Sequence, residues 1–175
     1  MNIRTATSED ADSIKKIHMA AFPDEEAGLV ATLAVDLLSE KTTPSTLSLL
    51  AENDTCAIGH VAFSPVTTDD ENFQGYILAP LAVLPGYQKH GAGSKLVEHG
   101  IGLLSDTSTH IVFVYGDPQY YSRFGFNAET AEKFIVPFKL EYPFGWLAKA
   151  FNEYDAGLSP ATISCVAALN KPELW

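Results

Sequence analysis

The sequence predicts an α/β fold in which a mixed, mostly antiparallel sheet is flanked by helices. Segments with apolar residues at helical spacing alternate along the chain with short segments typical of strands. Residues 111–115, Ile-Val-Phe-Val-Tyr, are an unbroken apolar run, as expected for a central strand covered on both faces. The chain has 175 residues, of which 46% are hydrophobic and 19% charged, so it fits one domain with a substantial core.

The first part of the chain is predicted to form a strand, two helices and a hairpin. Thr7 and Asp10 match a variant of the capping box, and apolar residues then recur at helical spacing between Ile14 and Ala21. The pair Asn53-Asp54 separates two strand-like segments and is typical of a hairpin turn. The expected ranges are 2–6 for the first strand, 25–38 for the second helix, and 47–52 and 57–64 for the hairpin strands.

The second part of the chain is predicted to add strands, a longer helix and an apolar C-terminal segment. Pro85-Gly86 ends one strand, and Gly125 ends a turn and short helix that follow residues 111–115. The remaining expected ranges are 76–84 for the strand before Pro85, 91–104 for the next helix, 144–151 for a short amphipathic helix and 162–169 for a closing strand.

Charge and composition argue against several classes of partner. With 22 acidic and 11 basic residues the net charge is −11, which argues against nucleic acid or an anionic membrane as the main partner. The polar start shows no signal-peptide core, and no apolar run is long enough to cross a bilayer.

Cys56 and Cys165 are expected to be buried free thiols in a reducing cytoplasm. The five histidines lack metal-ligand spacing, so no metal is predicted.

Residues 85–96, Pro-Gly-Tyr-Gln-Lys-His-Gly-Ala-Gly-Ser-Lys-Leu, join a predicted strand to a predicted helix. Free N–H groups in the first turn of a helix, together with the helix dipole, favour an anion there. Gly91 and Gly93 lack Cβ atoms, so a phosphate can approach the backbone closely. Lys89 and Lys95 add positive charge to an otherwise acidic chain. The segment therefore predicts an anion site, although the same glycines would also suit a tight turn without a ligand.

The segment Gln88-Lys89-His90-Gly91-Ala92-Gly93 resembles the Q/R-x-x-G-x-G/A signature of the GCN5-related N-acetyltransferase (GNAT) superfamily. It lies behind a predicted strand and before a predicted helix, as that family requires. The resemblance implies a GNAT fold and a loop whose amides hold the pyrophosphate of acetyl-coenzyme A (acetyl-CoA). The cofactor-binding residues that it implies are Gln88, Lys89, His90, Gly91, Ala92, Gly93 and Ser94 in the loop, and Leu81, Ala82 and Val83 in the strand.

A second segment strengthens the resemblance. Residues 120–126, Tyr-Tyr-Ser-Arg-Phe-Gly-Phe, are similar to the family's F/Y-Y-x-x-x-G-F segment and follow a further predicted strand, in the expected order. Arg4 and Asp10 also resemble the usual family start. The resemblance implies an acetyltransferase core over residues 1–130. Residues 131–175 are then a C-terminal extension of the same domain, most like the YhbS-type acetyltransferases.

The resemblance implies roles for several side chains. Tyr121 occupies the position at which the family has a proton donor to the departing thiolate. A phenol with a pKa near ~10 is protonated at neutral pH and can fill that role. Packing beneath the cofactor is the alternative role for Tyr121. It is the role expected for Tyr120 and Phe124, which are therefore also predicted to be cofactor-binding residues. Glu25 and Glu26 are the leading candidates for the general base, although acidic residues at a helix start also complement its dipole.

Other residues leave alternatives open. Asp117 or a water chain could serve as the base in place of the glutamates. Neither cysteine has a basic neighbour that would lower its pKa, so an acylated cysteine is not expected. Tyr142, Phe144 and Trp146 either line the acceptor pocket or anchor the C-terminal extension to its domain.

Taken with the resemblance, these features predict a cytoplasmic enzyme that moves acetyl from acetyl-CoA to a primary amine by direct attack in a ternary complex. The acceptor is expected to be a small molecule or a peptide, and the sequence does not identify it. The alternative is a non-catalytic acyl-CoA-binding or regulatory domain that keeps the loop without chemistry. Members of the family often dimerise, so a homodimer is an expected assembly, whereas nucleic acid and membrane partners are not expected.

Overall fold

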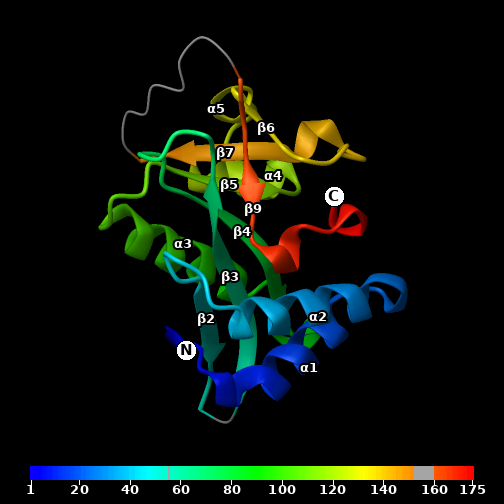
Figure 1. Cartoon of the computed structure of the whole chain (residues 1–175). Coiled ribbons are helices and arrows are strands. Elements are labelled where there is room, and N and C mark those ends of the chain that lie inside the picture. Colours follow the sequence, from blue (N-terminus) through cyan, green and yellow to red (C-terminus); the bar gives the residue numbers. More distant parts are fainter. Residues whose placement is uncertain (55, 152–159) are drawn as a thin grey trace. The chain divides into compact units, whose positions relative to one another are not determined.

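The computed structural model describes residues 1–54, 56–151 and 160–175 of the chain (Figure 1). Its main sheet contains the strands β1 (Asn2–Thr5), β2 (Leu47–Glu52), β3 (Ala57–Thr67), β4 (Gly75–Val83), β5 (Ile111–Tyr115), β7 (Trp146–Ala150) and β9 (Ser164–Cys165). The strand order is β1-β2-β3-β4-β5-β7, with β9 paired to β3. β4 and β5 are parallel, whereas β1–β2, β2–β3, β3–β9 and β5–β7 are antiparallel. The predicted mixed, mostly antiparallel sheet is therefore confirmed.

The chain divides into two units, and strands β3 and β4 each contribute residues to both. The first unit comprises Met1–Phe63 and Ala79–Gly102, and the second comprises Ser64–Leu78 and Leu103–Trp175. The first unit holds α1 (Ala11–Ala21), α2 (Asp24–Ser39) and most of α3 (Ala92–Ser105). The second unit holds the short helices α4 (Pro118–Tyr121) and α5 (Ala128–Ala131), and the two-stranded sheet of β6 (Phe134–Ile135) and β8 (Ala161–Thr162).

In the first unit, helices lie on both faces of strand β3. His60 of β3 contacts His18 of α1, whereas Phe63 of β3 packs against Gly100 of α3. Because successive residues of a strand point to opposite faces, α1 and α3 cover opposite sides of β3. One side of this unit is filled by a cluster of buried apolar residues from α1, α2, β2 and β4, namely Ile14, Ile17, Ala34, Leu50 and Ala82.

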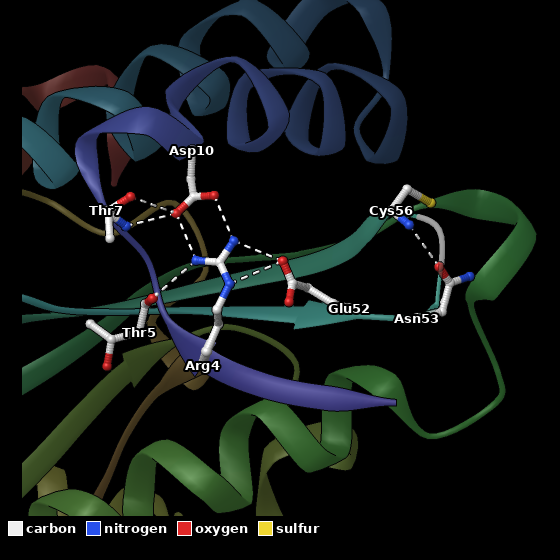
Figure 2. A network of polar contacts seen from close by, with 7 residues as sticks. All are labelled: Arg4, Thr5, Thr7, Asp10, Glu52, Asn53 and Cys56. Carbon is white, nitrogen blue, oxygen red and sulfur yellow. Dashed lines mark hydrogen bonds and ion pairs between the residues drawn. The ribbon is translucent and has the colours of Figure 1, made fainter.

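An ion-pair network joins β1 to the start of α1 and to β2 (Figure 2). Arg4 donates to the two carboxylate oxygens of Asp10 at 2.7 and 2.8 Å, and twice to Oε1 of Glu52, at 2.7 and 3.0 Å. Asp10 also accepts from the backbone N–H of Thr7 at 2.7 Å, which confirms the predicted capping box. The Arg4 guanidinium holds the pKa of the Asp10 carboxyl well below its usual range, so the pair is ionised at neutral pH.

In the second unit, β5 is the central strand that its apolar sequence predicts. It pairs with Gly75–Leu78 of β4 on one side and with β7 on the other, and four of its five residues are buried. The ring of Trp146 in β7 stacks on Phe113 of β5 with 5.0 Å between centroids. The Trp146 indole N–H donates to the carbonyl of Phe134 at 3.0 Å, so its polar atom is satisfied within the core.

Two predictions for the C-terminal segment are wrong. Residues 144–151 were expected to be helical, but they contain β7, which pairs with β5 from Ala150↔Ile111 to Trp146↔Tyr115. Consecutive apolar residues are compatible both with a helix and with a strand covered on both faces. The strand forms here because β5 has an edge on which residues 146–150 can pair. Residues 162–169 do not form one strand, because the chain there passes from β8 through β9 into a 3₁₀ turn at Ala167–Leu169.

The cysteines also differ from expectation. Cys56 is exposed beside the β2–β3 hairpin and Cys165 is half-buried, so the prediction of two buried thiols is wrong. Across the described residues, none of the helices combines the length and the apolar character needed to span a membrane.

Candidate active site

Strand β4, a short loop and helix α3 place ten of the predicted cofactor-binding residues, 81–83 and 88–94, in one continuous segment of the first unit. The other two, Tyr120 and Phe124, lie in the second unit. Leu81, Ala82 and Val83 form the end of β4. The backbone N–H of Leu84 donates to Ile58 of β3 at 2.9 Å, which fixes the point where the chain leaves the sheet. The Gln88 side chain folds back and donates to the carbonyl of Val83 at 2.9 Å, so it braces the loop against the strand.

The loop reaches α3 through two residues with positive φ. Lys89 has a φ of 63° and Gly91 a φ of 85°, and a Cβ placed on Gly91 would have no heavy atom within 4 Å. The His90 side chain donates from Nδ1 to the carbonyl of Gln88 at 2.7 Å. The left-handed conformation at Gly91 is one that glycine adopts without strain, so this residue type suits the turn into the helix.

The main-chain amides at this turn lie at the N-terminal end of α3. The first backbone bond of α3 runs from the N–H of Lys95 to the carbonyl of Gly91 at 3.0 Å. Within the described residues, no acceptor is recorded for the amides of Lys89 to Ser94. The first turn of α3 carries no acidic residue, and Lys89, His90 and Lys95 are exposed beside it. Free amides, a helix N-terminus and basic side chains together favour an anion at this point.

The two predicted bases lie elsewhere in the same unit. Glu25 and Glu26 occupy the first turn of α2 and are exposed. Among the described residues, neither carboxylate has a recorded hydrogen bond or ion pair, and neither is placed against the loop by any recorded contact. Their position at a helix start matches the alternative role that the sequence left open, in which they complement the helix dipole.

Tyr121 belongs to an aromatic cluster of the second unit, together with Tyr120 and Phe124. Its ring also lies edge-on to Phe126, with 5.8 Å between centroids. A Cβ placed on Gly116 would lie 2.6 Å from Cε2 of Tyr121, so the ring packs directly on that glycine. Burial, and after it the neighbouring Tyr120 and Asp117, raises the pKa of the phenol above its ordinary value. In the described part of the chain the hydroxyl has no recorded hydrogen-bond partner.

A cavity of about 420 Å³ lies beside this cluster, within the second unit. Three aromatic residues, Tyr115, Tyr142 and Phe144, line it together with the backbone of Gly116 and Gly145. The remaining lining residues are Asp117 and Pro118. Tyr142 and Phe144 were predicted either to line the acceptor pocket or to anchor the C-terminal extension. In the structure they line a cavity.

Trp146, the third aromatic residue of that prediction, does not line the cavity. It is only 7% exposed and stacks on Phe113 in the core. Sequence reasoning missed Tyr115, Gly116 and Gly145, because they come together only when β7 pairs with β5. The one available sequence signal was the Tyr-Gly dipeptide at the end of a predicted strand.

A buried histidine pair in the first unit was also missed. His18 Nε2 lies 2.8 Å from His60 Nδ1, and His60 Nε2 lies 2.8 Å from the Ser48 hydroxyl. Both rings are fully buried, and burial lowers the pKa to about 4 for His18 and about 3 for His60. The signal for His18 was its place on the apolar face of α1, one residue after Ile17. Among the described residues, no group of three or more metal-ligating side chains is found.

Known proteins resemble this chain in sequence. The model of the acetyltransferase (GNAT) family matches residues 11–126. The chain is 36% identical over 149 residues to the uncharacterized N-acetyltransferase YjhQ of Escherichia coli, covering 82% of this chain and 80% of that protein. It is 39% identical over 129 residues to the uncharacterized N-acetyltransferase YhbS of Escherichia coli, covering 73% and 74%.

Solved structures agree with the sequence comparison. The crystal structure of Escherichia coli YhbS in complex with CoA superposes with a TM-score of 0.79 and 29% identity, covering 97% of this chain and 92% of that one. A GNAT family acetyltransferase from Brucella melitensis in complex with acetyl-CoA gives a TM-score of 0.69 at 29% identity, covering 97% of both chains. The predicted GNAT fold is confirmed, and the chain belongs to the GNAT family of acetyltransferases.

Proposed function

We propose that the protein transfers an acetyl group from acetyl-CoA to a primary amine by direct attack in a ternary complex. The observation that carries this proposal is the row of main-chain amides from Lys89 to Ser94, which have no recorded acceptor within the described residues. These donors at the start of the 14-residue helix α3 fit a diphosphate. Because related GNAT proteins were solved with CoA and with acetyl-CoA, the diphosphate of acetyl-CoA is the anion that we assign to them.

The reaction forms a bond from the amine nitrogen to the acetyl carbon and breaks the bond from that carbon to sulfur. A free amine with a pKa near ~10 is mostly protonated at neutral pH, so a base must first accept its proton. Glu25, Glu26, Asp117 and water remain the candidates for that base. A backbone N–H at Ala82 or Val83 is the proposed donor to the carbonyl oxygen as negative charge develops there.

Tyr121 is the proposed donor to the departing sulfur. Its raised pKa means that the hydroxyl is protonated throughout the neutral range. Since a thiol titrates near ~8.5, below this phenol, Tyr121 stabilises the thiolate chiefly by a hydrogen bond, and solvent can supply the final proton. The hydroxyl is free for that task in the described part of the chain, because no protein acceptor or donor is recorded for it.

The test is a steady-state assay of thiol release from acetyl-CoA with a panel of primary amines. Direct attack predicts that release depends on the amine and that double-reciprocal plots at several amine concentrations intersect. Parallel lines would point to an acyl-enzyme and overturn the ternary-complex step. Tight CoA binding without release for any amine would instead support the non-catalytic acyl-CoA-binding alternative. The cytoplasmic location and the homodimer stay predictions from the sequence and the family.

A further inference from the structure

A cavity lies between the end of β5 and the start of β7. Its volume of about 420 Å³ is within the range typical of small-molecule sites. Tyr142 and Phe144 stand at its surface, with 54% and 68% of their area exposed. Exposed aromatic side chains beside a hollow are the usual means of holding a flat apolar group.

Two hydrogen bonds, one of them to a side-chain hydroxyl, hold the wall of the cavity in place. The Tyr115 hydroxyl accepts from the backbone N–H of Tyr142 at 2.8 Å, and the N–H of Gly116 donates to the carbonyl of Gly145 at 2.9 Å. A Cβ on Gly145 would lie 2.9 Å from the carbonyl oxygen of Gly116, so the two segments approach closely only because a glycine is present. These contacts therefore fix the backbone from which Tyr142 and Phe144 project.

Trp175 also packs against this wall. Trp175 stacks on the ring of Tyr115 at 6.4 Å with 17° between planes, and its indole N–H donates to the carbonyl of Leu169 at 3.0 Å. Because Tyr115 is packed on one side by Trp175 and bonded through its hydroxyl to Tyr142, its ring has a defined orientation toward the cavity.

Charge at the cavity favours a cation. Of the seven described residues that line it, Asp117 alone has an acidic or basic side chain, and it is exposed. Its Oδ1 accepts from the backbone N–H of Gln119 at 2.8 Å, and no partner among the described residues is recorded for Oδ2. One carboxylate among aromatic faces attracts a single ammonium group, by ion pairing and by the aromatic faces themselves.

The cavity also adjoins the proposed proton donor. Gly116 lines the cavity and is also packed against the ring of Tyr121, and the carbonyl of Asp117 accepts from the backbone N–H of Tyr121 at 3.0 Å. The cavity and the proposed proton donor thus share Gly116 as a neighbour.

We infer that this cavity binds the acetyl acceptor, and that the acceptor is a primary amine with a flat apolar body, an arylalkylamine in chemical class. This inference rests on the proposed function. A polyamine or an amino sugar would bring several charged or hydroxyl groups to a wall that offers them one free carboxylate oxygen, so few of those groups would gain a partner from the lining side chains. An aryl group, by contrast, is covered by Tyr115, Tyr142 and Phe144.

The experiment compares kcat/KM for 2-phenylethylamine, ethylamine and spermidine in the full chain and in Phe144→Ala. We expect 2-phenylethylamine to be preferred over both other amines. Phe144→Ala should raise KM for 2-phenylethylamine about five- to ten-fold and should have a smaller effect on ethylamine, because only 2-phenylethylamine loses an aryl contact with the ring. Ile135→Ala, which removes a side chain 49% exposed elsewhere in this unit, is the matched control and should change neither value.

A preference for spermidine over 2-phenylethylamine, or equal losses for ethylamine and 2-phenylethylamine in Phe144→Ala, would overturn the inference and leave the proposed function intact. If no amine is acetylated, the proposed function fails, and binding of 2-phenylethylamine measured by calorimetry decides the inference separately. Binding that weakens in Phe144→Ala but not in Ile135→Ala supports the cavity as an arylalkylamine site. Absence of binding, or binding indifferent to Phe144, overturns it.

Discussion

Tyr121 is the single side chain on which the proposed chemistry depends most. Its ring is held between Gly116 and an aromatic cluster, and this packing would be the same in a phenylalanine. The substitution Tyr121→Phe therefore separates the hydroxyl from the ring. It distinguishes the proton donor from the packing residue, the two roles that the sequence left open.

We predict that Tyr121→Phe lowers kcat about 100-fold with little change in thermal stability or in CoA affinity. The measurement is steady-state thiol release, with CoA binding by calorimetry as its companion. Phe126→Leu, which alters the same cluster without touching a hydroxyl, is the comparison variant. An undiminished kcat in Tyr121→Phe would assign the residue to packing alone.

Arg4 illustrates a residue whose role is stability. Its guanidinium makes four hydrogen bonds to Asp10 and Glu52, joining three elements of the first unit. Because its side chain is 37% exposed, water screens these bonds and reduces their contribution.

We expect Arg4→Met to lower the free energy of unfolding by about 1–2 kcal/mol, mainly because two partly buried carboxylates lose their partner. Lys16→Met removes an equal charge from the exposed face of α1 and should change stability by less than about 0.5 kcal/mol. Urea unfolding of both variants checks this. Equal effects of the two substitutions would show that net charge, and not the network, matters.

Local sequence patterns were sufficient to predict those helices, strands and turns that depend only on their own residues. The capping box at Thr7, the hairpin of β2 and β3, and the strand-loop-helix segment around Gly91 all follow from short-range rules and were predicted. Strand β7 was not, because its apolar residues fit two periodicities and only pairing with β5 selects one. The cavity depends on that pairing, so Gly116 and Gly145 could not be brought together from sequence.

The pairing of β7 with β5 yields a prediction about the C-terminal extension. A chain ending at residue 130 would leave Ile111–Tyr115 without its antiparallel partner and Phe113 without the ring of Trp146. An apolar unpaired edge of this kind promotes aggregation. We therefore expect residues 1–130 to show no cooperative thermal unfolding, in contrast to the full chain. A sharp transition in the shortened chain would mean that the first 130 residues fold independently.

For the molecule as a whole, the buried pair of His18 and His60 makes stability depend on pH. Both pKa values lie below the ordinary value, at about 4 and about 3, so the unfolded chain binds more protons than the folded one below about pH 6.5. Stability should therefore fall as the pH drops from about 6.5 toward 4. This arrangement was out of reach of sequence reasoning, because His18 and His60 come from different elements and meet only in the folded unit.

We predict a loss of about 2 kcal/mol for each of the two histidines between about pH 7 and about pH 5. Urea unfolding at both pH values measures it. The double substitution His18→Gln/His60→Gln should flatten the dependence, whereas His99→Gln, on the exposed side of α3, should leave it unchanged. A double variant that retains the full dependence would assign it to other groups.

The account as a whole depends on the amides of Lys89 to Ser94 holding a diphosphate. The most direct measurement is the amide ¹H–¹⁵N spectrum of the full chain during titration with CoA, compared with titration by pantetheine, which lacks the diphosphate. We predict that several of these amide protons move downfield with CoA and stay in place with pantetheine, as new hydrogen bonds to phosphate oxygens require. If CoA binds while these amides remain unperturbed, the central claim is wrong.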